Sequence, residues 1–179
     1  GSAGWGLRLV NEGCDRAAGF AAGSLSSDTG GSIRQPASLC GLVGVKPTYG
    51  LVSRQGIVAF ASSLDQVGPF THTVADAALM MEVIGGHDPL DSTSLPQPMP
   101  SLTSVLGQGV TGLLIGRLAD MPDGCEPEVL ARMDAAYAAL QAAGATIVDI
   151  SLPSLSYCLT AYYLVAPAEA SSNLARYDG

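Results

Sequence analysis

The 179-residue chain has the composition of one folded domain, with 47% apolar and 13% charged residues. This apolar fraction is enough to bury a core and excludes a disordered polymer. No uninterrupted apolar run approaches the roughly 20 residues that a membrane helix needs, and the N-terminus lacks a secretory signal pattern. We therefore expect a soluble, cytoplasmic protein without membrane contact.

The net charge is −8, from seven arginines and one lysine against sixteen acidic residues. A protein that holds nucleic acid by itself usually presents a basic face that neutralises phosphates. Such a face is hard to build here, so any nucleic-acid contact is expected to go through a partner. The four cysteines are widely spaced and form no C-x-x-C pair, which favours free thiols in a reducing cytosol over zinc or disulfides.

In the first third of the chain, short apolar segments alternate with glycine-rich turns. Residues 15–22 are small and mostly apolar, as at the end of a helix, and residues 23–32 are rich in glycine and serine. Residues 41–45 predict a short buried strand. Residues 56–61 form a second short apolar run.

A helix is expected to start after Thr73, which can serve as its N-cap, with Asp76 three residues further on. Apolar residues follow at helical spacing, and the glycine pair at 85–86 supplies the stop. Residues 87–109 are rich in proline, serine and glycine and predict a long surface loop.

The second half alternates between strand and helix patterns. Residues 112–118 and 145–150 predict strands, and residues 126–143 between them predict an amphipathic helix. Residues 154–176 predict a further helix, kinked at Pro167. Strand–helix–strand with short connections implies a parallel pair and an α/β layered sheet.

The segment Ser-Asp-Thr-Gly-Gly-Ser at 27–32 carries the clearest chemistry. Acyl transfer from an amide needs a nucleophile and donors for the tetrahedral oxyanion. Ser32 can serve as the first, and the backbone amides of Thr29, Gly30 and Gly31 can form the second, because glycines let the chain bend sharply. Asp28 and Arg34 flank the serine and are expected to pair and support the loop. On the hexapeptide alone, an ordinary glycine-serine turn remains an alternative.

A longer stretch of the sequence favours the catalytic interpretation over an ordinary turn. Residues 28–37, followed by Cys-Gly-Leu-Val-Gly-Val-Lys-Pro-Thr-Tyr-Gly at 40–50, resemble the core of the amidase signature family. The resemblance implies the α/β/α amidase fold with a mixed central sheet and a Ser–cis-Ser–Lys triad in which Ser32 is the nucleophile. It also implies an oxyanion hole formed by the amides of residues 29–31.

Within this family, residues 56–69, 86–94 and 168–179 are most similar to the glutaminase subunits of tRNA-dependent amidotransferases. The resemblance implies that glutamine is hydrolysed to supply ammonia, which partner subunits use to convert Glu-tRNA(Gln), or Asp-tRNA(Asn), to its amide form. No Gly-x-x-x-x-Gly-Lys loop is present, so ATP and Mg²⁺ are expected at a partner subunit. Contact with tRNA is likewise expected through a partner.

Two parts of the family pattern are missing. The catalytic lysine of the family lies upstream of the serine loop, whereas Lys46 of this chain occupies a structural turn. The second serine of the triad is also missing, because residues 1–16 depart from the family pattern and offer only Ser2, at the wrong spacing. We expect residues 1–179 to be part of one amidase domain that is inactive as given. The alternatives are a stand-alone amidase acting on a small amide and a catalytically dead remnant that binds partner subunits.

A few other residues have two interpretations each. Asp65 is expected to make structural hydrogen bonds, with anchoring of the serine loop or a place in the site as alternatives. Tyr163 matches an aromatic near the family's substrate pocket, although a tyrosine in an apolar helix is more often part of the core. His72 and His87 are expected in solvated loops, and no metal site is expected.

Overall fold

The structure is a computed structural model, which describes residues 19, 21–119 and 124–177. The chain divides into two compact units, one formed by residues 1–105 with 163–179 and the other by residues 106–162. The predicted departure from pattern at 1–16, including Ser2, lies outside the described residues, as does most of the helix end predicted at 15–22.

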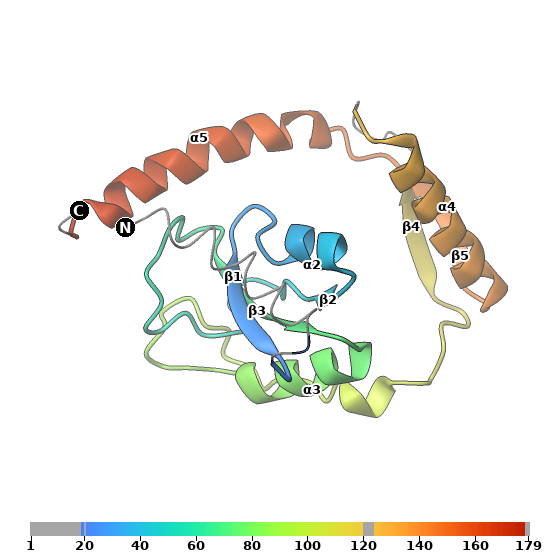
Figure 1. The fold of residues 1–179 in the computed structure, drawn as a ribbon, viewed down its shortest axis with the longest axis horizontal. Helices are drawn as coiled ribbons and strands as arrows, with labels where there is room; N and C mark the ends of the chain where they lie inside the picture. The colour runs from blue at the N-terminus through green and yellow to red at the C-terminus, as the bar shows by residue number, and fades with distance from the viewer. Residues whose placement is uncertain (1–18, 20, 120–123, 178–179) are drawn as a thin grey trace. The chain divides into compact units, whose positions relative to one another are not determined.

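The first unit is built on an antiparallel sheet of three strands, β1 (Ser24–Asp28), β3 (Gln66–Thr71) and β2 (Val43–Gly44), with β3 in the middle (Figure 1). All six residues of β3 are buried. Gly68 allows a close approach in this strand, because a Cβ there would meet the Val45 carbonyl oxygen at 1.8 Å. The central strand therefore requires glycine at this position.

Two of these strands were not predicted from the sequence. β1 lies within the glycine- and serine-rich segment at 23–32, and β3 follows the apolar run at 56–61, which is irregular. The more buried face of β1 consists of Ser24, Ser26 and Asp28, whereas its one apolar residue, Leu25, is exposed, so the strand has no apolar alternation that a sequence pattern could detect. The strand predicted at 41–45 shortens to the two residues of β2.

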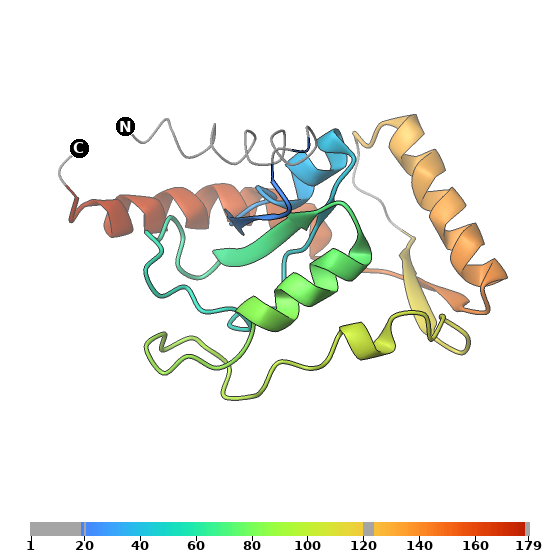
Figure 2. The same ribbon diagram turned by 60° about the horizontal axis from the view of Figure 1, so that its bottom comes forward.

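Two helices, α2 (Arg34–Cys40) and α3 (Val74–Ile84), lie on opposite sides of this sheet (Figures 1 and 2). On β3, Phe70 packs in a core cluster with Ile33 and Ala37, whereas Val67, which points to the other face, packs with Val52 and Met81. The short helix α2 was not predicted.

The start of α3 confirms the predicted cap. The Thr73 side chain accepts a hydrogen bond from the Asp76 backbone amide at 3.1 Å, and the helix ends at Ile84 with Gly85 as its C-cap. The predicted loop at 87–109 is irregular apart from the short 3₁₀ turn η1 (Thr103–Val105).

The second unit confirms the predicted strand–helix–strand order. Strands β4 (Leu114–Leu118) and β5 (Thr146–Ile150) are parallel and are joined by helix α4 (Pro127–Ala142). Across the pair, Arg117 makes two hydrogen bonds to Asp149, at 2.6 and 3.0 Å. With antiparallel pairing in one unit and parallel pairing in the other, the chain has the predicted α/β class.

Helix α5 (Leu155–Leu174) follows β5, and its residues from Tyr163 onward belong to the first unit. Pro167, where a kink is predicted, lies inside this helix, and the helix continues through it to Leu174 (Figure 1). Within the described part of the chain, no helix combines the length and apolarity that crossing a bilayer requires.

Candidate active site

The serine loop is a strand–turn–helix segment. Strand β1 ends at Asp28, residues 29–33 turn, and α2 begins at Arg34. Gly31 has a φ of 136°, which only glycine adopts readily, so the turn depends on its missing Cβ. Ser32 lies half-buried in this turn, immediately before the helix.

The carboxylate of Asp28 organises the turn. This side chain is fully buried, and it accepts hydrogen bonds from the backbone amides of Gly31 at 2.7 Å, Ile33 at 3.2 Å and Arg34 at 3.3 Å. The Arg34 guanidinium adds two further hydrogen bonds, each at 3.0 Å, in a bidentate geometry. The expected Asp28–Arg34 pair is therefore present, and the backbone on either side of Ser32 is attached to one carboxylate.

These contacts also keep Asp28 ionised. Burial alone would raise the pKa of Asp28, but hydrogen bonds from the Arg34 side chain and from the amides of Ile33 and Arg34 outweigh it and hold the pKa below its usual value. A buried, fully hydrogen-bonded carboxylate of this kind fixes geometry and does not exchange protons near neutral pH. We therefore assign Asp28 to loop support.

One of the three amides expected around an oxyanion has a partner within the protein. The Gly31 N–H donates to Asp28 Oδ1, so in this structure it caps the turn. The amides of Thr29 and Gly30 lie directly before it in the same turn. Within the described residues, no hydrogen bond to the Ser32 hydroxyl is present.

A second buried carboxylate, Asp65, connects the serine loop to a turn formed by residues 60–65. Its Oδ1 accepts a hydrogen bond from Thr29 Oγ1 at 2.5 Å, and its Oδ2 accepts one from the Phe60 amide at 2.8 Å. The Ala61 amide donates to both oxygens, at 3.2 and 3.1 Å. The structural role expected for Asp65 is confirmed, and its anchoring of the serine loop is observed directly.

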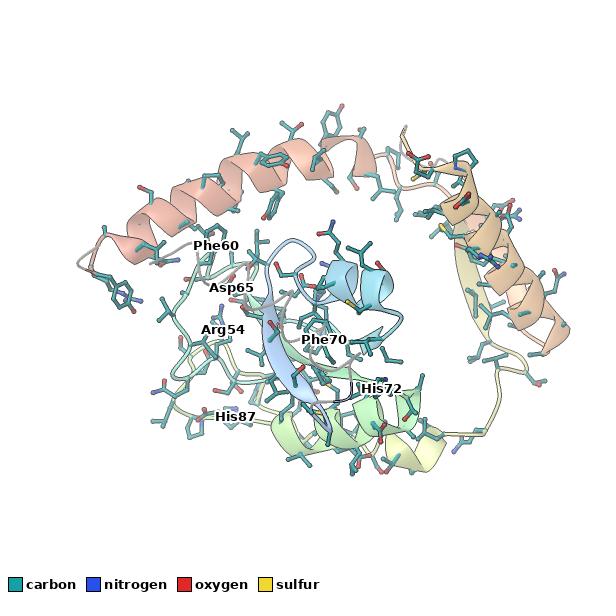
Figure 3. The ribbon with its side chains drawn as sticks, in the orientation of Figure 1. Arg54, Phe60, Asp65, Phe70, His72 and His87 are labelled. Atoms are coloured by element: carbon teal, nitrogen blue, oxygen red, sulfur yellow. The ribbon has the colours of Figure 1, made fainter. Side chains whose placement is uncertain are left out.

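The outer side of the 60–65 turn contacts α5, a contact that the sequence did not indicate. Glu169 accepts hydrogen bonds from the Ser63 amide at 3.0 Å and the Ser63 hydroxyl at 2.5 Å. Asn173 Nδ2 donates to the Phe60 carbonyl at 3.1 Å and to Ser62 Oγ at 3.0 Å. In Figure 3, Phe60 and Asp65 lie between the C-terminal half of α5 and β1.

Arg54 forms a further polar network next to this turn (Figure 3). Its guanidinium donates to the Ser62 carbonyl and to Thr93 Oγ1, and it lies 5.0 Å from the centre of the Tyr49 ring. The Arg54 amide donates to Asp91 at 2.9 Å. Burial raises the pKa of Asp91, but hydrogen bonds from Arg54 and Thr93 outweigh it and lower the pKa to about 2.

A hollow of about 180 Å³ borders this network and is lined by Arg54, Ser62, Asp65 and Asp91, among others. Ser32 does not line it. Since the substrate of an acyl-transfer reaction must contact the nucleophile, this hollow alone does not identify the reacting centre, and we base the site on the serine loop instead.

Four other residues singled out from the sequence lie away from the serine loop's hydrogen bonds. Lys46 Nζ donates to the Pro47 carbonyl at 2.8 Å, in line with the structural role expected for it. His72 and His87 are exposed, as predicted. Tyr163 is 64% exposed, so the core alternative for this residue is wrong in this structure, and its place in a substrate pocket remains a prediction.

The described residues contain no group of three or more histidine, cysteine, aspartate or glutamate side chains that could hold a metal ion. Cys125 and Cys158 have free thiols.

Comparison with known proteins identifies the family to which the chain is similar. The chain matches the family model described as Amidase over residues 15–179. It is 62% identical over 164 residues to the A subunit of glutamyl-tRNA(Gln) amidotransferase from Moorella thermoacetica, an alignment that covers 91% of this chain and 34% of the relative.

Among solved structures, the same subunit from Thermotoga maritima superimposes with a TM-score of 0.85 at 46% identity, over 94% of this chain and 37% of that one. A peptide amidase from Stenotrophomonas maltophilia superimposes with a TM-score of 0.82 at 34% identity, over 93% and 35% of the two chains. The chain thus spans about a third of the length of the relatives that it matches. The family model covers nearly all of its residues, and the chain therefore belongs to the amidase signature family.

Proposed function

We propose that this chain carries the nucleophile segment of a glutaminase subunit of a glutamyl-tRNA(Gln) amidotransferase, with Ser32 as the nucleophile. The observation that carries the proposal is the environment of Ser32. Its hydroxyl makes no hydrogen bond among the described residues, while Asp28 holds the backbone on both sides of it. A fixed backbone with an available hydroxyl is the arrangement that nucleophilic catalysis requires.

In the proposed reaction, Ser32 Oγ attacks the side-chain carbonyl carbon of glutamine, and the carbonyl oxygen becomes an oxyanion. The backbone amides of Thr29 and Gly30 donate hydrogen bonds to this oxyanion. The Gly31 amide, which donates to Asp28, shares its hydrogen between that carboxylate and the oxyanion. The C–N bond then breaks, ammonia leaves with the proton taken from the serine, and a glutamyl ester remains on Ser32. Water hydrolyses the ester and releases glutamate.

The proton of Ser32 requires a base, because free serine is a weak nucleophile. The one lysine of the chain, Lys46, is hydrogen-bonded to the Pro47 carbonyl, so we do not assign it this role. Our proposal assigns the base to the lysine that the family carries upstream of the serine loop. Ammonia transfer to Glu-tRNA(Gln), ATP with Mg²⁺, and tRNA contact are assigned to partner subunits.

The second candidate is a stand-alone amidase, and the similarity to the peptide amidase favours it as the alternative. The chain superimposes on about a third of both the amidotransferase subunit and the peptide amidase, so the fold alone does not distinguish the two activities. The higher identity to the amidotransferase subunit supports the first candidate. A remnant that only binds partner subunits is the non-enzymatic alternative.

The test measures ammonia release from glutamine by this chain and by a chimera in which it replaces the matching segment of the Moorella thermoacetica subunit, co-expressed with that subunit's partners. Each is compared with its Ser32→Ala variant and assayed also with a peptide amide. We expect no activity from the chain alone and glutamine-dependent ammonia release from the chimera that Ser32→Ala abolishes. A chimera whose activity survives Ser32→Ala would show that Ser32 is not the nucleophile. Preference for the peptide amide without partners would favour the second candidate, and an inactive chimera that still binds partners would favour the third.

A further inference from the structure

A chain of hydrogen bonds connects the C-terminal half of α5 to the serine loop. It runs from Glu169 and Asn173 to the 60–65 turn, and from that turn through Asp65 to Thr29. All of these residues lie in the same compact unit, although up to 113 positions separate the bonded partners in sequence.

The α5 end of this connection is a defined face of the helix. Ala166, Glu169, Ala170 and Asn173 are spaced by three or four residues and so lie on one side of α5. The two alanines are 1% and 8% exposed, which shows that this side of the helix is packed. Glu169 and Asn173 are the polar members of that packed face, and both contact the turn.

The turn end of the connection is held from both sides. On the outside, Ser63 is bonded to Glu169 through its amide and its hydroxyl. On the inside, Asp65 accepts from the Phe60 and Ala61 amides and from Thr29. The turn therefore connects Glu169 on one side with Thr29 on the other.

We infer that Glu169 and Asn173 are positioning residues for the serine loop and act on it through Asp65 and Thr29. Helix α5 sets the conformation of the 60–65 turn, and the turn sets the conformation of the backbone that bears Thr29, Gly30 and Gly31. The effect on catalysis rests on the proposed function, whereas the physical coupling does not.

The coupling is tested by residue-resolved amide hydrogen exchange in the full chain, with Phe60 as reporter on the turn and Gly31 as reporter on the serine loop. Loss of these hydrogen bonds is expected to speed local exchange about five- to tenfold. Glu169→Ala should speed exchange at both reporters. Glu169→Gln retains a carbonyl acceptor for Ser63 and should restore much of the protection, and Ser171→Ala, on an exposed part of the same helix, should change neither.

A second pair of variants separates coupling from general loosening. Thr29→Val removes the hydroxyl that Asp65 accepts from, so in that background Glu169→Ala should still speed exchange at Phe60 but should change Gly31 no further. If Glu169→Ala in the wild-type background speeds exchange at Phe60 and leaves Gly31 unchanged, the inference is wrong. Unchanged exchange at both reporters overturns it as well. Asn173→Ala, which removes no charge, provides the same test if Glu169→Ala prevents folding.

The catalytic consequence is measured in the chimera. There Glu169→Ala should lower kcat more than it changes KM, and Glu169→Gln should recover part of kcat. Failure of the proposed function would appear as activity that survives Ser32→Ala, with the exchange results unaffected. Failure of the coupling would appear as unchanged exchange at Gly31 while Ser32→Ala still abolishes activity.

Discussion

In the unit that carries the serine loop, two buried carboxylates hold the backbone through several hydrogen bonds, whereas in β4–α4–β5 the ion pair across the two strands lies at the surface. Asp28 and Asp65 are 0% and 4% exposed, and both accept several hydrogen bonds. Among the described residues between 106 and 162, only Ala145 is buried, and the Arg117–Asp149 pair is about half exposed.

This difference shows what carboxylates contribute in each environment. A buried carboxylate that accepts backbone amides fixes a conformation, because its removal leaves donors unsatisfied away from water. An exposed ion pair competes with water and salt for the same interaction and contributes little. The serine loop therefore depends on its carboxylates, and the second unit does not.

The largest effect is expected for Asp28→Asn. The amide nitrogen that replaces a carboxylate oxygen would face N–H donors and would leave Gly31 or Arg34 without an acceptor. We expect a loss of about 2–3 kcal/mol in the free energy of unfolding, measured by urea denaturation. Arg34→Lys, which keeps the buried carboxylate and loses only the bidentate geometry, should cost clearly less. Equal losses in the two variants would contradict the central role of the carboxylate.

An intermediate effect is expected from pH, through Asp91. Its pKa is about 2 in the folded chain against 3.8 for the unperturbed group, so the folded state binds fewer protons between these values. Its contribution to stability is therefore present above about pH 4 and is lost as the pH falls toward 2. The slope of the free energy of unfolding over this range should be shallower in Asp91→Asn than in the wild type. Identical slopes in the two proteins would show that the pKa of Asp91 is the same in the folded and the unfolded state.

The smallest effect is expected for Asp149→Asn in the second unit. Its partner Arg117 keeps its hydration when the exposed pair is lost, so the free energy of unfolding should change little. The difference from wild type should shrink further in 1 M salt, where exposed charges are screened. A loss as large as that of Asp28→Asn would remove the contrast between the two units.

The sequence alone determined the features that depend on local periodicity and local hydrogen bonding. The β4–α4–β5 unit, the Thr73 cap of α3 and the Asp28–Arg34 pair all involve residues near one another in the chain, or strands that a helical pattern separates cleanly. The family match also rests on such a contiguous pattern of residues.

Tertiary structure decided the elements whose partners lie far away in the sequence. β1 is rich in serine, and β3 contains glutamine, glycine and proline, so neither has a strand pattern of its own; pairing with each other makes them strands. The contacts of Asp65 with Thr29 and of Glu169 with Ser63 join residues 36 and 106 positions apart. No local signal encodes such contacts, because the partners come together only when the chain has folded.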